Sequence, residues 1–108
     1  MKGLKVTFAE SNYTFIRETS KAIEFENSKN KEVVYLLHNV EISIVLNPKT
    51  VENNDSLMNR SSGKYHNTAL RQFPKRKNKG KSLIHYGYTF KFQSENELST
   101  FLTNLNVS

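Results

Sequence analysis

Residues 84–92 read Ile-His-Tyr-Gly-Tyr-Thr-Phe-Lys-Phe, and this stretch decides the fold. Large apolar side chains occupy every second position, and small or polar side chains lie between them. Because successive side chains of a strand point to opposite faces of a sheet, the alternation predicts a long strand with one buried face. Gly87 lies in the middle of this strand and predicts a bulge or a sharp bend, a usual means of curling a small sheet.

Shorter runs of the same kind precede this strand along the chain. Residues 33–37 form a continuous apolar run with the length and β-branched character of a buried strand. The dipeptide His38-Asn39 then predicts a tight hairpin turn, and one long bent strand is the alternative. The other predicted strands lie at residues 4–8, 13–15, 23–25, 40–46 and 64–72.

After Ser94 the apolar spacing changes from two residues to three and four. Ser94 and Glu97 form the pattern Ser-x-x-Glu, a capping box in which each side chain satisfies a backbone amide of the first helical turn. Four apolar side chains follow on one helical face and predict a helix of about three turns, which must lie on the sheet to be stable. These side chains are Leu98, Phe101, Leu102 and Leu105.

The length of 108 residues predicts one domain, residues 1–108, and the absence of cysteine excludes a disulfide framework. The apolar clusters are shorter than the ~20 residues that span a bilayer, and the N-terminus lacks the apolar core of a signal peptide, so a cytoplasmic location without a membrane is expected. The Asn- and Ser-rich residues 47–63 predict a long loop, and residues 73–81 predict an exposed basic loop. The expected fold class is α+β, mainly β, with a small curled sheet or barrel and one C-terminal helix.

Charge is distributed unevenly along the chain. Between Ser56 and Ser94 there is no Asp or Glu, whereas nine Lys or Arg residues lie in this stretch, and the whole chain has a net charge of +6. Concentrated positive charge costs a small domain self-repulsion, and a polyanionic partner offsets this cost because each neutralised phosphate releases counterions. We therefore expect a nucleic-acid partner, and a solvated lysine-rich loop is the alternative.

The expected nucleic-acid-binding residues lie in this basic stretch. Aromatic faces beside cations grip single-stranded RNA by base stacking and backbone neutralisation, which favours RNA over DNA. The expected phosphate contacts are Lys75, Arg76, Lys77, Lys79 and Lys81, extended by Arg60, Lys64 and Arg71, and the expected base contacts are Tyr65, His66 and His85. Tyr86 and Tyr88 share a strand face with apolar neighbours and are expected in the core.

Two other functions stay open at this point. A metal-independent ribonuclease of the toxin type would need cationic and proton-transfer side chains, and the suitable types are present as His66, Arg71, His85 and Tyr86. A protein-interaction module would use residues 33–37 as an edge strand for dimerisation. The three histidines match no metal-ligand spacing, so no metal or other cofactor is expected.

Three segments resemble small regulatory proteins of enterococcal pheromone-responsive conjugative plasmids: Lys-Val-Thr-Phe at 5–8, Tyr-Leu-Leu-His-Asn-Val at 35–40 and His-Tyr-Gly-Tyr-Thr-Phe-Lys-Phe at 85–92. Those proteins limit overproduction of plasmid-encoded surface adhesins, and their fold is similar to the PUA family of RNA-binding barrels. The resemblance covers nearly the whole chain and implies an RNA partner, a Gram-positive cytoplasm and no catalysis. It carries over no binding residue, because the PUA family has no compact motif to match.

Overall fold

The computed structural model describes residues 3–77, 80 and 82–106, and these residues form an antiparallel sheet with four short helices. The fold is α+β and mainly β, as predicted, but the sheet is open and not closed into a barrel. The strands are β1 (Tyr13–Glu18), β2 (Ala22–Asn27), β3 (Val33–Leu37), β4 (Ile42–Leu46), β5 (Gly63–His66), β6 (Lys75–Lys77) and β7 (Leu83–Phe92). The helices are α1 (Leu4–Glu10), α2 (Pro48–Glu52), α3 (Asp55–Arg60) and α4 (Glu95–Asn106).

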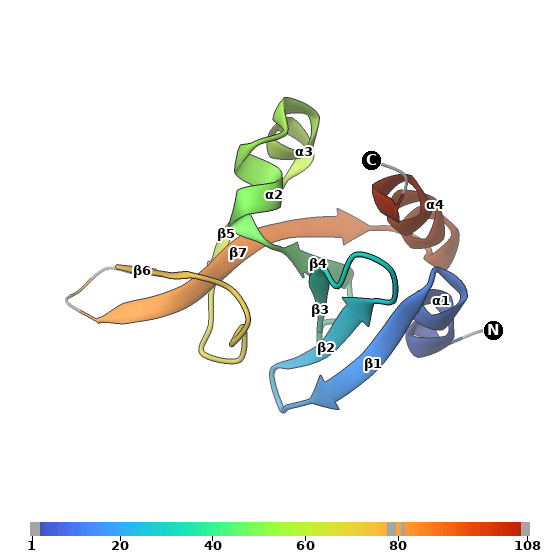
Figure 1. Cartoon of the computed structure of the whole chain (residues 1–108), viewed down its shortest axis with the longest axis horizontal. Coiled ribbons are helices and arrows are strands. Elements are labelled where there is room, and N and C mark those ends of the chain that lie inside the picture. Colours follow the sequence, from blue (N-terminus) through green and yellow to red (C-terminus); the bar gives the residue numbers. More distant parts are fainter. Residues whose placement is uncertain (1–2, 78–79, 81, 107–108) are drawn as a thin grey trace.

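The strands follow the order β1-β2-β3-β4-β7-β5, and β6 pairs separately with β7 (Figure 1). Val34 lies opposite Leu46 and Leu36 opposite Ile44, so β3 and β4 form the predicted hairpin and not one bent strand. The turn is longer than expected, because β3 ends at Leu37 and β4 begins at Ile42. Since β3 lies between β2 and β4, the alternative in which it is an edge strand for dimerisation is wrong.

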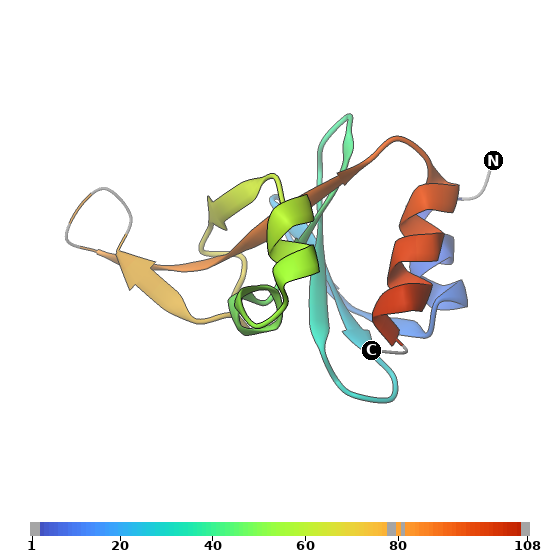
Figure 2. The ribbon, with the colours of Figure 1, turned by 90° about the horizontal axis from the view of Figure 1, so that it is seen from above.

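Strand β7 is the longest strand and pairs with three others. Its residues 88–92 pair with β4, residues 86–89 with β5 and residues 83–85 with β6. The first half of β7 therefore projects beyond the body of the sheet and is flanked by β5 and β6 (Figures 1 and 2). We call β5, β6 and residues 83–89 of β7 the arm.

Gly87 lies where β7 changes its partner from β4 to β6. The pairing with β5 continues without a register shift through Gly87, which lies opposite Tyr65, so the predicted bulge is absent. A Cβ atom on Gly87 would lie 2.5 Å from Val45 Cγ1, 2.7 Å from the Leu46 carbonyl oxygen and 3.0 Å from Phe73 Cδ2. Glycine is required here because neighbouring backbone and side chains approach closely.

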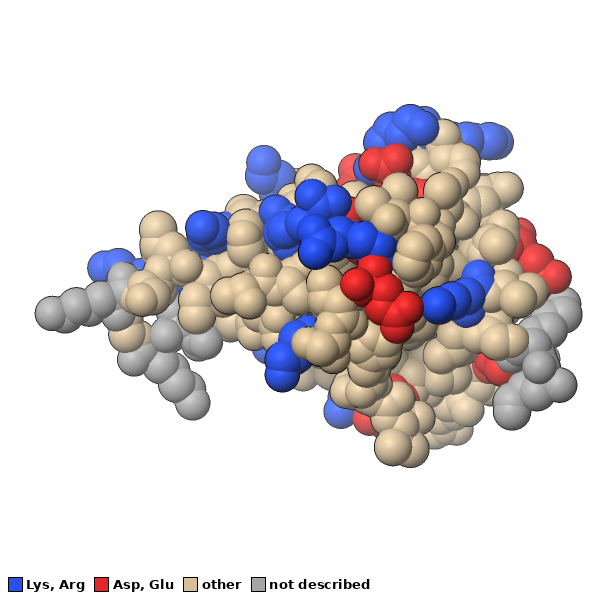
Figure 3. All heavy atoms as spheres, turned by 90° about the horizontal axis from the view of Figure 1, so that it is seen from below, with Lys and Arg blue, Asp and Glu red and all other residues tan. Residues whose placement is uncertain are grey.

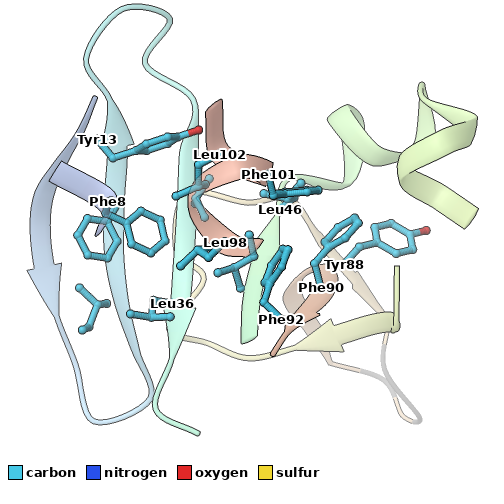
Figure 4. Close-up of a cluster of buried hydrophobic side chains, with 14 of the residues drawn as sticks. Phe8, Tyr13, Leu36, Leu46, Tyr88, Phe90, Phe92, Leu98, Phe101 and Leu102 are labelled. Atoms are coloured by element: carbon cyan, nitrogen blue, oxygen red, sulfur yellow. The ribbon is translucent and has the colours of Figure 1, made fainter. Parts of the chain in front are cut away.

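One face of the sheet carries the main hydrophobic core (Figure 4). The alternating apolar side chains of β7 point into it, and α1 and α4 cover it at the end of the sheet away from the arm (Figure 2). In α4, Leu98, Phe101 and Leu102 are buried and Leu105 is half-buried, which confirms the predicted stripe. The Glu97 amide donates to Ser94 Oγ at 3.2 Å as predicted, but the Glu97 carboxylate accepts from the Gln93 amide at 2.8 Å.

The opposite face carries a second, smaller core beneath the segment that joins β5 to β6. Leu70 and Phe73 of this segment pack on Tyr35 and Val45 of the central strands. Only residues 64–66 of the predicted strand at 64–72 belong to a strand, β5, and the remainder folds back over the sheet. The second core therefore fixes the entry of the chain into β6.

The prediction of a strand at residues 4–8 is wrong, because these residues belong to α1. Leu4 and Phe8 are four residues apart and pack on the core, whereas Val6 is exposed. Leu4 and Phe8 fit a strand and a helix equally well, because positions i and i+4 share a face in both, and over so short a run only Val6 favours the strand. Packing against α4 and β1 decides for the helix.

The predicted loops at 47–63 and 73–81 are also corrected. Residues 47–63 contain α2 and α3, whose first turns are capped by the side chains of Asn47 and Asn54. Asparagine favours loops and helix N-caps for the same reason, since its side chain hydrogen-bonds to nearby backbone amides. In the second segment Phe73 is buried and Lys75–Lys77 form β6.

In the part of the chain that the structure describes, no helix is long and apolar enough to span a membrane.

Gly87→Ala should destabilise the fold by about 1–3 kcal/mol, because the added methyl group must displace Val45 and the Leu46 backbone. Chemical denaturation measures the free energy of unfolding. Gly3→Ala is the matched control, since a Cβ there meets no atom within 4 Å, and it should cost a few tenths of a kcal/mol at most. Equal effects of the two substitutions would contradict the role given to Gly87.

Candidate nucleic-acid interface

The arm has two faces, and the register of its strands divides the predicted binding residues between them. His66 lies opposite Tyr86, Lys64 opposite Tyr88 and Arg76 opposite Ile84. Because side chains of directly paired residues share a sheet face, these groups lie on the face that carries the main core further along β7. We call the side chains of Lys64, His66, Arg76 and Tyr86 the aromatic face. Lys75, Lys77 and His85 lie on the opposite face.

The aromatic face is a row of planar groups across three strands. The His66 and Tyr86 rings are stacked, with centroids 5.7 Å apart and an angle of 22° between their planes. On the other side, Arg76 Cζ lies 5.4 Å from the centroid of the Tyr86 ring. The Tyr86 hydroxyl donates to Glu52 at 3.3 Å, and Tyr88 donates to the same carboxylate oxygen at 2.9 Å. Tyr86 is thus held in place from three sides.

His66 is the unusual member of this row. Its Nε2 atom is buried and has no hydrogen-bond partner among the described residues. Burial lowers the pKa of the imidazole below its ordinary value, and the charges of Arg76 and Lys64 lower this pKa further. The ring is therefore neutral at pH 7, and its Nε2 atom is an unsatisfied polar group that is closed to solvent.

The opposite face of the arm has a different character. His85 Nδ1 donates to the Phe73 carbonyl oxygen at 2.6 Å, and Tyr65 packs on the second core. These two predicted base contacts therefore have structural partners within the fold. Lys75 and Lys77 are exposed, and neither forms an ion pair with any described carboxylate.

Arg71 does not extend the basic patch. Its guanidinium makes two hydrogen bonds to the buried Glu24 carboxylate, at 3.0 and 3.1 Å. Tyr35 donates to the same carboxylate at 3.0 Å and accepts from the Gln72 amide at 3.0 Å. A carboxylate that is 3 % exposed must be paired, so this network uses the Arg71 charge to anchor the segment before β6.

The structure places the remaining predicted residues in three situations. Arg60 lies beyond the arm at the end of α3, with its guanidinium 5.3 and 5.0 Å from the ring centroids of Phe92 and Phe101. Lys79 and Lys81 lie outside the described residues. The four cations that the arm brings together are Lys64, Lys75, Arg76 and Lys77.

Figure 3 shows the surface of the molecule that faces downward in Figure 1. Its narrow end carries Lys and Arg and no Asp or Glu, whereas acidic side chains lie in the wider part. The segment that lacks carboxylates in the sequence therefore also forms a surface region without carboxylates in this view. Tyr88 is buried in the main core and Tyr86 is half-buried against it, as predicted. The sequence did not indicate Glu52, because the contact of α2 with β7 joins residues more than thirty positions apart.

The geometry also bears on catalysis and metal binding. His66 and His85 lie on opposite faces of the sheet, and Arg71 is paired with Glu24, so the four ribonuclease candidates do not form one site. Within the described ranges, no three His, Asp or Glu side chains are grouped so that they could hold a metal ion.

Arg71→Ala should lower the free energy of unfolding by about 2–4 kcal/mol, because it leaves the buried Glu24 charge without its counter-ion. The double variant Arg71→Ala with Glu24→Gln should recover part of this loss, since the neutral amide needs no counter-ion. Urea denaturation of the single and double variants tests both statements. A loss below about 0.5 kcal/mol in Arg71→Ala would show that the pair is not structurally required.

His66 should titrate below pH 6.5, its value in the unfolded chain. A lowered folded-state pKa means that the unfolded chain binds the proton first, so this contribution to stability is present above pH 6.5 and is lost as the pH falls through the folded-state value. Proton NMR follows the imidazole signals, and His66→Gln assigns the His66 resonance by its absence. A midpoint at or above 6.5 would contradict the burial of this ring.

No protein-family model, curated protein or solved structure matches this chain in the comparisons made. The residues of the arm and their geometry therefore carry the functional proposal.

Proposed function

We propose that the protein binds single-stranded RNA through the arm. The observation that carries this proposal is the combination of four cations without carboxylate partners and a row of planar side chains on the same three strands. Cations neutralise phosphates and release counterions, and planar groups stack with unpaired bases.

Two structural points favour RNA single strands over duplex DNA. A two-stranded ribbon such as β6 with β7 can enter the major groove of DNA, but reading it requires polar side chains directed at base edges. The arm instead presents a row in which Tyr86 lies between the His66 ring and the Arg76 guanidinium, so that the outer sides of His66 and Arg76 are the stacking surfaces for bases that are not already paired.

The wider role we propose is that of a cytoplasmic, non-enzymatic regulator. The resemblance to regulators of conjugative plasmids supports this role and suggests control of surface adhesin expression. The separation of His66 from His85 by the sheet is consistent with binding without cleavage.

Reversing the charges of Lys75, Arg76 and Lys77 to Glu should reduce affinity for RNA of any sequence by about ten- to a hundredfold and flatten the salt dependence. Each lost single-strand phosphate contact lowers the slope of log K against log salt by about 0.7. Fluorescence anisotropy with single-stranded RNA, duplex RNA and duplex DNA of equal length measures these quantities at several salt concentrations.

The matched control reverses Lys21, Lys29 and Lys31, which are exposed on the turns that flank β2. This variant has the same net charge as the arm variant, so only the location of the charges differs. An equal loss of affinity in both variants would show that the loss depends only on net charge. Unchanged binding by the arm variant would show that the arm is not the RNA-binding site. RNA recovered intact after incubation in EDTA separates binding from metal-independent cleavage.

A further inference from the structure

Arg60 is the one predicted cation that lies on the main-core face of β7 but outside the arm. Its guanidinium lies over the rings of Phe92 and Phe101, with Cζ 5.3 and 5.0 Å from their centroids, and these two rings are 3 % and 6 % exposed. It forms no ion pair with any carboxylate of the described residues. One side of the guanidinium is thus covered by aromatic rings, and the side chain as a whole remains exposed.

Two adjoining hollows between α3 and α4 share Arg60, Phe101 and Asn104 in their walls. Their volumes are about 230 and 290 Å³. Besides Arg60, the polar groups around them are mainly amides and hydroxyls, and the second hollow also has the Glu97 carboxylate in its wall. A carboxylate disfavours a phosphate but accepts from the amino groups of a nucleobase.

The position of Arg60 relative to the arm follows from the pairing of β7. Arg76 lies opposite Ile84, His66 opposite Tyr86 and Lys64 opposite Tyr88, while Arg60 lies over Phe92. All four β7 positions are even-numbered and share one face. Lys64 is exposed on edge strand β5 between the two ends of this series.

The length of this series suits one strand of nucleic acid. The eight residue-to-residue steps from Ile84 to Phe92 span about 26 Å at about 3.3 Å per step. At about 3.4 Å per stacked nucleotide, about eight nucleotides cover this distance. Helix α2 lies over the middle of β7, where Glu52 accepts from Tyr86 and Tyr88, so the nucleic acid must pass beside this helix. An oligonucleotide of twelve residues exceeds the direct span and has the length for such a path from Arg76 to Arg60.

We propose that the groove between α3 and α4 is a nucleobase subsite, in which a base of the RNA bound by the arm stacks on the outer face of the Arg60 guanidinium. Stacking on arginine planes is a common mode of recognition of unpaired bases. The Asn104 amide and the Glu97 carboxylate provide hydrogen-bonding groups for the base edge. This proposal rests on the proposed RNA binding by the arm for its polymeric ligand, but the base itself can be tested separately.

The test compares Arg60→Leu and Arg60→Lys in binding to a twelve-residue oligoadenylate. Leucine keeps apolar packing on the two phenylalanine rings, and lysine keeps the charge but lacks the planar group. Both variants should bind about tenfold more weakly than the wild type. Full affinity in Arg60→Lys would show a simple charge contact and overturn the stacking subsite, as would full affinity in Arg60→Leu.

A second measurement distinguishes the groove from the arm. Adenosine, which has no phosphate, should shift the NMR signals of the Asn104 side-chain amide and of Arg60 Nε–H, and it should do so also in the variant with Lys75, Arg76 and Lys77 reversed. Shifts in that variant support the groove even if the arm proves not to bind RNA. Absence of shifts at millimolar adenosine in the wild type would overturn the subsite, whatever the arm does.

Discussion

The close backbone approach at Gly87 is the constraint on which the remainder of the structure depends. Val45, the Leu46 carbonyl and Phe73 all meet at a point that a Cβ atom would fill. At this point β7 parts from β4 and takes β6 as its new neighbour. A larger residue would separate the two cores from the strand that connects them, and the arm would lose its fixed direction.

The buried carboxylate of Glu24 is a second constraint, because it needs a positively charged partner, and Arg71 provides that charge. Arg71 and Tyr35 satisfy the carboxylate, and Tyr35 in turn accepts from the Gln72 amide. Glu24, which lies in the acidic half of the chain, thus holds the segment that leads into β6 through its bonds to Arg71. The pair contributes specificity of arrangement more than net stability, because desolvation of both charges offsets much of their attraction.

Positive charge can be concentrated at the end of the arm because β6 and the first residues of β7 form a thin ribbon whose side chains are exposed or half-exposed. Lys75 and Lys77 point to one side and Arg76 to the other, which separates like charges by the thickness of a strand. The compact body has no such freedom, and its exposed cations are mixed with carboxylates, as the pairs Lys5–Glu18 and Lys91–Glu41 show. The shape of the molecule and the distribution of its charges are therefore related.

The sequence by itself determined the elements that have a long, regular apolar period, which are strand β7 and the apolar stripe of α4. It indicated strands at β3 and β4 but left open whether they form a hairpin or one bent strand. It also determined that the excess of positive charge lies in one segment. Only the tertiary structure decided that residues 4–8 are helical and that Arg71 forms an ion pair with Glu24. It also decided that the Tyr86 ring contacts His66 and Arg76. The physical reason is that short apolar runs fit both periods, and that the partner of a charge or a ring is set by contacts between residues far apart in the chain.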